Sequence, residues 1–82
     1  MLEELAEREW VTGLKQTKRA LSEGHAERVF LACDSDESLL APVLKLCREN
    51  SVPVCSSCTM QQLGRACRIQ VRCAAAAVLR PE

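Results

Sequence analysis

Short apolar segments with helix-like and strand-like spacing alternate along this chain, and this alternation limits its fold more than any other feature. Apolar residues recur at the spacing of an amphipathic helix at Leu40, Val43, Leu44 and Cys47. Pro42 is tolerable only in the first turn of that helix. Val29–Cys33 is instead an unbroken apolar run, as in a strand buried on both faces. In 82 residues this alternation predicts one layered α/β domain, spanning 1–82, with helices packed against a small sheet.

Further elements are predicted on both sides of this pair. We expect a short acidic helix within Met1–Glu9, a brief strand at Trp10 and Val11, a helix from Leu14 to Glu23 ended by Gly24, a loop over Asp34–Glu37, a strand over Val52–Cys55, and a helix from Met60 to Cys67. Thr59 and Gln62 form the capping box of the last helix, and Pro53 suits a strand edge or start. Cys73–Leu79 is ambiguous, because alanine favours helix whereas the alternation requires a strand.

The charges are balanced in number but not in position. Eleven basic and eleven acidic residues cancel, so net charge gives no indication of a partner. Between Asn50 and Pro81, however, there is no Asp or Glu, while four arginines occur there: Arg65, Arg68, Arg72 and Arg80. A second basic face lies on the helix predicted from Leu14, where Lys15, Lys18, Arg19 and Ser22 share one side and Leu14, Thr17 and Leu21 another. A charged face is usually plain solvated surface, but two basic ones favour a polyanionic partner.

The acidic start and the lack of a long apolar run predict a reducing compartment, which sets the expected state of the cysteines. The acidic start is the opposite of a secretory signal, and the longest apolar run, Cys73–Leu79, is far shorter than the roughly 18 residues that span a bilayer. We therefore expect a cytoplasmic protein without a membrane partner. Thiols stay reduced in that compartment, so the six cysteines are not a disulfide framework by default, and most are expected to be small core side chains.

Rival functions have weaker sequence signals. Cys55 and Cys58 form a CxxC that could join Cys67 and Cys73 in a zinc site, but the second pair lacks the spacing of a zinc knuckle, and the CxxC does not open a helix as a redox motif would. His25, the sole histidine, is expected in an exposed turn. No catalytic constellation appears, so we expect neither an enzyme nor a cofactor or metal. A protein adaptor that uses Leu39, Met60 or the acidic first helix stays open.

Several motifs together resemble one family. These are Gly13-Leu14-Lys15-Gln16-Thr17-Lys18-Arg19, the apolar strand with Asp34, Val52-Pro53-Val54, Leu63-Gly64-Arg65-Ala66-Cys67 and Ile69-Gln70-Val71. Their order and spacing resemble the kink-turn-binding ribosomal protein superfamily, the "L seven Ae" class, and especially its small bacterial members. The resemblance implies a three-layer α/β/α sandwich around a small four-stranded mixed sheet, in which Cys73–Leu79 is a strand.

The resemblance also implies an RNA site. Gly13, Lys15, Gln16 and Arg19 match positions that contact the tandem sheared G·A pairs of a kink-turn, and Leu14 replaces a common Thr there. Asp36 matches an acidic position that meets a flipped-out nucleotide. Ile69 and Val71 would cover the extruded bases, with Gln70 and Arg72 at their edges. Arg68 and Arg72 stand where relatives usually have Gly. The expected partner of this monomer is a structured RNA with a kink-turn, with ribosomal RNA, a riboswitch and an RNase-type RNA all open.

Overall fold

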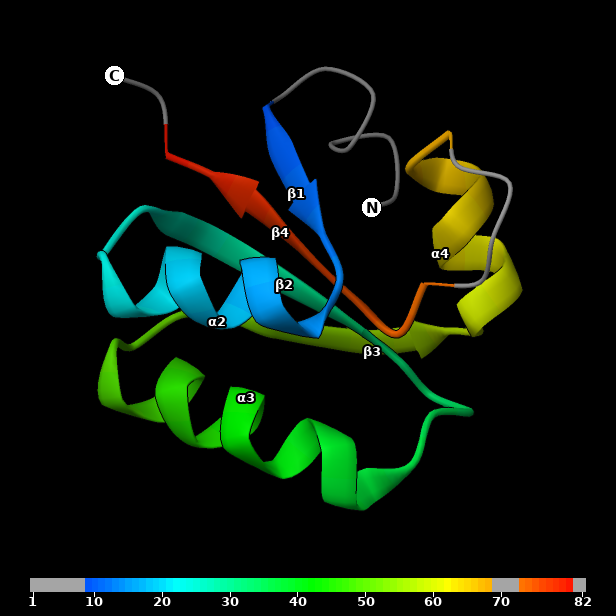
Figure 1. Ribbon diagram of the computed structural model, residues 1–82, viewed down its shortest axis with the longest axis horizontal. Coiled ribbons are helices and arrows are strands. Elements are labelled where there is room, and N and C mark those ends of the chain that lie inside the picture. Colours follow the sequence, from blue (N-terminus) through cyan, green and yellow to red (C-terminus); the bar gives the residue numbers. More distant parts are fainter. Residues whose placement is uncertain (1–8, 69–72, 81–82) are drawn as a thin grey trace.

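The computed structural model, which describes residues 9–68 and 73–80, forms a four-stranded sheet with helices on both faces (Figure 1). The strands are β1 (Trp10–Thr12), β2 (Ala26–Ala32), β3 (Val54–Cys58) and β4 (Ala75–Leu79), and the helices are α2 (Leu14–Ser22), α3 (Glu37–Glu49) and α4 (Met60–Ala66). The helix predicted within Met1–Glu9 lies, except for Glu9, outside the described residues.

The sheet is mixed and has the order β1-β4-β2-β3. β4 runs antiparallel to both of its neighbours, whereas β2 and β3 are parallel. β3 is an edge strand that follows Pro53, a residue that cannot donate a hydrogen bond to a ladder. The edge position predicted for this segment is therefore confirmed.

Alternate residues of the central strands serve two separate cores. Val29 and Leu31 of β2 pack with α2 and α3 on one face, whereas Phe30 between them packs with Leu63 and Cys67 on the α4 side. Successive side chains of a strand point to opposite faces, so a strand buried on both faces must be apolar at every position. The three-layer α/β/α sandwich is thereby confirmed.

The alanine-rich segment is the central strand β4, as the family resemblance implied. Ala75, Ala76 and Ala77 are fully buried; Ala76 and Ala77 pair with β1 on one side and β2 on the other, and Ala75 pairs with β2. Helix propensity favours another structure for these alanines, but ladder hydrogen bonds to two neighbours outweigh it. Their small side chains also let helices on both faces approach the sheet closely.

Several boundaries differ from prediction, and those of β2, β3 and α3 differ most. β2 starts at Ala26, and β3 covers Val54–Cys58 rather than Val52–Cys55, so the CxxC lies inside an edge strand. α3 begins at Glu37, which makes Pro42 its sixth residue rather than part of its first turn. The predicted position of Pro42 was wrong because the N-cap at Asp36, and not the proline, sets the start of the helix.

The apolar stripe of α3 is narrower than the sequence spacing predicted. Leu40, Val43 and Cys47 are buried, as predicted, whereas Leu44 is 38% exposed. Leu44 lines a depression beside β2 and β3 rather than the core. A helix packed on one side only therefore buries the centre of its stripe and leaves the margin partly in water.

Each described helix ends at a residue with positive φ. Gly24 follows α2 with φ of 73°, Ser51 follows α3 with 54°, and Arg68 follows α4 with 59°. The N–H groups of these residues donate to carbonyls of the preceding turn. This left-handed termination favours glycine. The conformation of Ser51 and of Arg68 therefore costs each residue about 1 kcal/mol more free energy than it would cost a glycine.

Candidate nucleic-acid interface

The start of α2 is a helix N-terminus with open donors. Gly13 has φ of 91° and ψ of 156°, and its own N–H donates to the carbonyl of Ala75 at 2.8 Å. The N–H of Thr17 donates to the Gly13 carbonyl at 3.0 Å, and within the described residues no side chain caps the helix. The N–H groups of Leu14, Lys15 and Gln16 therefore remain available to an anion or another hydrogen-bond acceptor outside the chain.

The polar side chains of α2 lie on two flanks of a buried stripe. Thr17, Ala20 and Leu21 are buried, and Leu14 packs partly against the same core. Gln16 and Lys18 are about 160° apart around the helix axis, so they cannot contact the same part of a ligand. Lys15 is exposed on the face between them, and Lys18 is half-buried.

Gln16 and Arg19 face the edge of the sheet. They line a shallow depression of about 140 Å³ together with Val11 of β1, Leu79 of β4 and three further residues, Ala20, Glu23 and His25. Nε of Arg19 lies 3.6 Å from Oε2 of Glu23, and the Arg19 side chain is 71% exposed. Nδ1 of His25 lies 3.9 Å from the other carboxylate oxygen of Glu23. The Arg19 guanidinium is therefore shared with the acid at the C-cap of its own helix.

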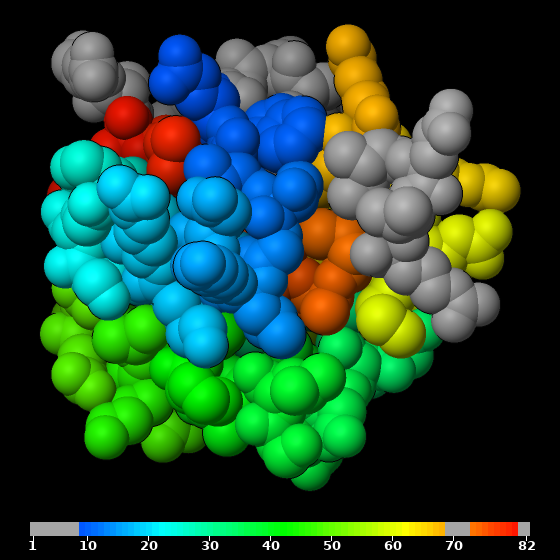
Figure 2. All heavy atoms as spheres, in the orientation of Figure 1, coloured from blue at the N-terminus to red at the C-terminus, as the bar shows by residue number. Residues whose placement is uncertain are grey.

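Hydrogen bonds bring the loop after β2, the start of α4 and the start of β4 to the same end of the molecule as Gly13. The backbone N–H of Met60 donates to Oδ1 of Asp34 at 2.8 Å, and the carbonyl of Met60 accepts from the N–H of Cys73 at 3.1 Å. The Gly13 bond to Ala75 joins α2 to the same strand start. Figure 2 shows the orange surface of the β4 start beside the blue surface of the α2 start.

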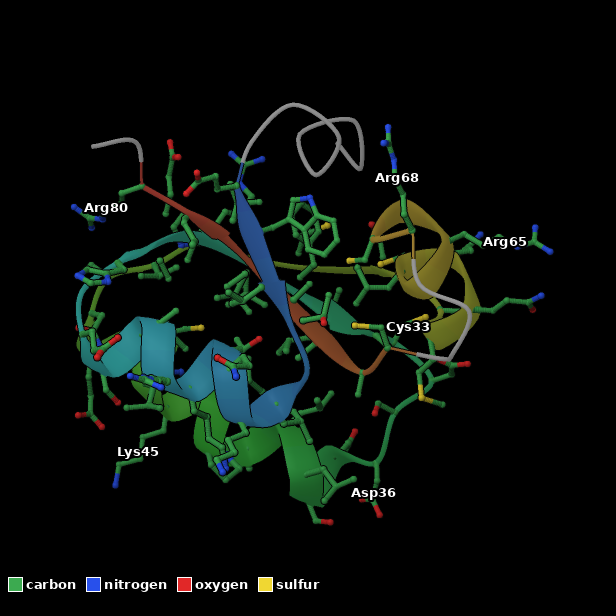
Figure 3. The ribbon with its side chains drawn as sticks, turned by 45° about the horizontal axis from the view of Figure 1, so that its top comes forward. Cys33, Asp36, Lys45, Arg65, Arg68 and Arg80 are labelled. Atoms are coloured by element: carbon green, nitrogen blue, oxygen red, sulfur yellow. The ribbon has the colours of Figure 1, made fainter. Side chains whose placement is uncertain are left out.

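Asp36 caps α3. Its Oδ1 accepts hydrogen bonds from the backbone N–H of Ser38 at 2.9 Å and from the Ser38 hydroxyl at 2.8 Å. These bonds, that of the backbone first, lower the pKa of the carboxyl below its ordinary value, so Asp36 stays charged. The carboxylate is exposed at the surface (Figure 3), and its capping bonds use one oxygen. The capping role was missed, although an acid two residues before Ser38 at a helix start is a recognisable signal.

The remaining predicted contacts lie in one short segment. Ile69, Gln70, Val71 and Arg72 are outside the described residues. Their neighbours in the chain differ, since Arg68 is exposed and Cys73 is buried. The contact of this segment with the extruded bases therefore stays a prediction.

The cysteines are mainly core side chains. Cys47, Cys58, Cys67 and Cys73 are buried, while Cys33 is exposed and Cys55 half-buried. Burial raises the pKa of the Cys47 and Cys58 thiols. A hydrogen bond between the other two buried thiols raises the pKa of Cys67 and lowers that of Cys73, whose Sγ also donates to the Ala75 carbonyl at 2.9 Å. Among residues 9–68 and 73–80, no cluster of three or more His, Cys, Asp or Glu side chains could hold a metal ion.

His25 is exposed in the turn after α2, as predicted. None of the helices in the described part of the chain has both the length and the apolar character required to cross a membrane.

Sequence comparisons relate this chain to one protein family and to named RNA-binding proteins. The model of the "Ribosomal protein L7Ae/L30e/S12e/Gadd45 family" matches residues 3–82. The RNA-binding protein YbxF of Geobacillus stearothermophilus is 47% identical over 70 residues, which cover 85% of each chain. An RNA-binding protein of Bacillus pumilus is 38% identical over 69 residues, with 84% of each chain covered.

Solved structures share the fold. A protein with unknown function from Bacillus halodurans C is 26% identical, with a TM-score of 0.82 over 94% of this chain and 77% of the other. The Giardia lamblia 15.5kD RNA binding protein is 22% identical and superposes with a TM-score of 0.86 over 99% of this chain and 68% of the other. At that identity the second likeness concerns the fold alone.

Proposed function

This chain belongs to the ribosomal protein L7Ae/L30e/S12e/Gadd45 family, and we propose that it is an RNA-binding protein that recognises a kink-turn. The observation that carries the proposal is the open N-terminus of α2, where Gly13 leaves three N–H groups free beside the exposed side chains of Lys15 and Gln16. Relatives at 47% identity that are named RNA-binding proteins support the choice of ligand. The natural RNA is a structured molecule such as ribosomal RNA or a riboswitch.

The side chains of α2 suit the edges of sheared G·A pairs. Lys15 donates to guanine O6 or N7, and the Gln16 amide both donates and accepts. Arg19 is placed to bind a phosphate once it leaves Glu23. The narrow major groove of regular A-form RNA excludes such side chains, whereas a kinked element with non-Watson–Crick pairs opens it.

The other contacts surround this centre. Asp36 accepts a hydrogen bond from a flipped-out nucleotide through the carboxylate oxygen that its capping bonds leave unused. Ile69 and Val71 cover the extruded bases, with Gln70 and Arg72 beside them. Leu14 packs against the core and so holds the turn at Gly13 in place. In this proposal the chain acts as a single monomeric domain in the cytoplasm and performs no catalysis.

We expect the protein to fold a kink-turn RNA in low magnesium, because its cations replace the ions that otherwise screen the phosphates at the bend. The measurement is fluorescence resonance energy transfer between dyes at the two stem ends of an RNA duplex. Saturating protein should shorten the distance between the dyes. A matched duplex in which Watson–Crick pairs replace the sheared G·A pairs is the control and should stay extended. An extended kink-turn at saturation would contradict the proposal.

Removing Glu23 should strengthen RNA binding. The Glu23→Gln substitution keeps the side-chain size but frees Arg19 from its ion pair. An exposed pair of this kind is worth about 0.2–1 kcal/mol, so the affinity for kink-turn RNA should rise about 1.5- to 5-fold. Titration of labelled RNA into both proteins measures the change. Glu49→Gln, which removes an exposed acid from the end of α3, is the control. An equal gain from both variants would mean that net charge, and not Arg19, is responsible.

A further inference from the structure

α4 carries a cationic face that the contacts above do not use. Arg65 lies in the last turn of α4 and Arg68 lies two residues beyond its end, and both are exposed, as is Gln61 in the first turn. Figure 3 shows Arg65 and Arg68 pointing away from α4. Within residues 9–68 and 73–80, neither guanidinium has an ion pair or a side-chain hydrogen bond. Both charges are therefore available to a partner.

This face differs from the cationic faces of the other described helices in having no acid near it in sequence. Arg19 of α2 pairs with Glu23, and Lys45 and Arg48 of α3 share their helix with Glu37 and Glu49. From Asn50 to Pro81 the chain has no Asp or Glu. Ordinary solvated surfaces carry charges of both signs, which favours solubility. A surface that carries only positive charges instead attracts a polyanion.

The backbone at Arg68 adds a second observation. Arg68 has φ of 59° at the position after a helix where glycine is preferred. Ser51 has the same conformation after α3, so the strain alone does not identify a site. At Arg68, however, the strained position carries a long, permanently charged side chain that contacts no acid in the described structure. A residue that weakens the fold locally without an internal partner is expected to act on something outside the chain.

The position of α4 connects its cationic face to the proposed kink-turn site. Its first residue, Met60, is hydrogen-bonded to Asp34 and Cys73 at the end of the molecule where α2 begins. Arg68, which follows the C-cap of α4, immediately precedes Ile69 in the chain. A ligand that covers the proposed site and extends along α4 would reach both arginines.

We propose that Arg65 and Arg68 bind backbone phosphates of one of the two stems that flank the kink, an extension that rests on the proposed kink-turn function. The planar guanidinium forms paired hydrogen bonds with phosphate oxygens. Phosphates repeat along a stem at a regular spacing, so two exposed arginines three residues apart in the chain can contact the backbone without reading sequence. The contacts add affinity and salt dependence and leave the choice of G·A pairs to α2.

The test compares salt dependence in two charge-matched double variants. Arg65→Gln with Arg68→Gln removes the α4 charges, and Lys45→Gln with Arg48→Gln removes two exposed charges from α3. Figure 3 places Lys45 far from Arg65 and Arg68. If the two arginines bind phosphates, the slope of log affinity against log salt should fall by about 0.9 for each contact. Between 50 and 200 mM salt the wild type should then lose about 12-fold more affinity than the α4 variant. The α3 variant should keep the wild-type slope.

Kink-turn RNAs with one stem shortened at a time identify the stem. Shortening the contacted stem should lower the wild-type slope, and the α4 substitutions should then have no further effect. The single Arg65→Gln variant, within the regular helix, should show half of the double variant's change. An unchanged slope in the α4 variant, or an equal change in the α3 variant, would overturn this inference alone. Failure of the wild type to distinguish the kink-turn from its Watson–Crick control would instead overturn the proposed function, and this extension with it.

Discussion

Replacing Gln16 with alanine should weaken kink-turn binding by about 1–3 kcal/mol, which is the usual loss for a base-edge contact. The variant should also lose discrimination between sheared G·A pairs and their Watson–Crick replacements. The physical reason is that a positioned amide can both donate to and accept from a base edge, and Gln16 is exposed in the first turn of α2 beside the open N–H groups. Titrations of both RNAs with the wild type and the variant measure the two effects.

Lys18→Ala is the matched control for this prediction. Lys18 lies on the same helix, but on the other flank of the buried stripe, and is half-buried. Its removal should weaken binding slightly and equally for both RNAs, mainly through salt dependence. If Lys18→Ala proves more harmful than Gln16→Ala, then α2 binds RNA as a cationic strip and does not read the base pairs.

The elements whose patterns depend only on local chemistry could be predicted from the sequence. The capping box of Thr59 and Gln62 forms as expected, with hydrogen bonds of 2.9 and 3.2 Å, because both partners are three residues apart. The end of α2 at Gly24 likewise follows from one residue that tolerates positive φ. Boundaries that depend on partners distant in sequence were less accurate, as β3 illustrates: its start is set by pairing with β2.

The candidate site shows the same division. The open N-terminus at Gly13 and the exposure of Lys15 and Gln16 follow from the helix pattern. The bonds from Met60 to Asp34 and Cys73 could not be predicted, since they join three segments that only the tertiary fold brings together. The pairing of Arg19 with Glu23 was available from their i,i+4 spacing, yet spacing alone does not indicate which exposed pairs form.

The conformation of Gly13 leads to the other large expected effect. Gly13→Ala should lower the free energy of unfolding by about 1–3 kcal/mol, because φ of 91° with ψ of 156° lies in a region essentially restricted to glycine. Within the described part of the chain, a Cβ at this position would meet no atom within 4 Å apart from those of its chain neighbours, so the loss comes from the backbone and not from a clash. Denaturant unfolding of the wild type and the variant measures it.

The same substitution should weaken RNA binding further, since an L-residue draws the turn towards negative φ and redirects the N–H groups that precede Thr17. Gly24→Ala is the control: it also has positive φ, of 73°, and no atom within 4 Å of an added Cβ, but it lies at the opposite end of α2. It should lose about 1 kcal/mol of stability and keep its affinity for kink-turn RNA, measured at a temperature where both variants are folded. Should Gly13→Ala bind as tightly as Gly24→Ala, the turn before α2 serves the fold alone and the RNA site lies elsewhere.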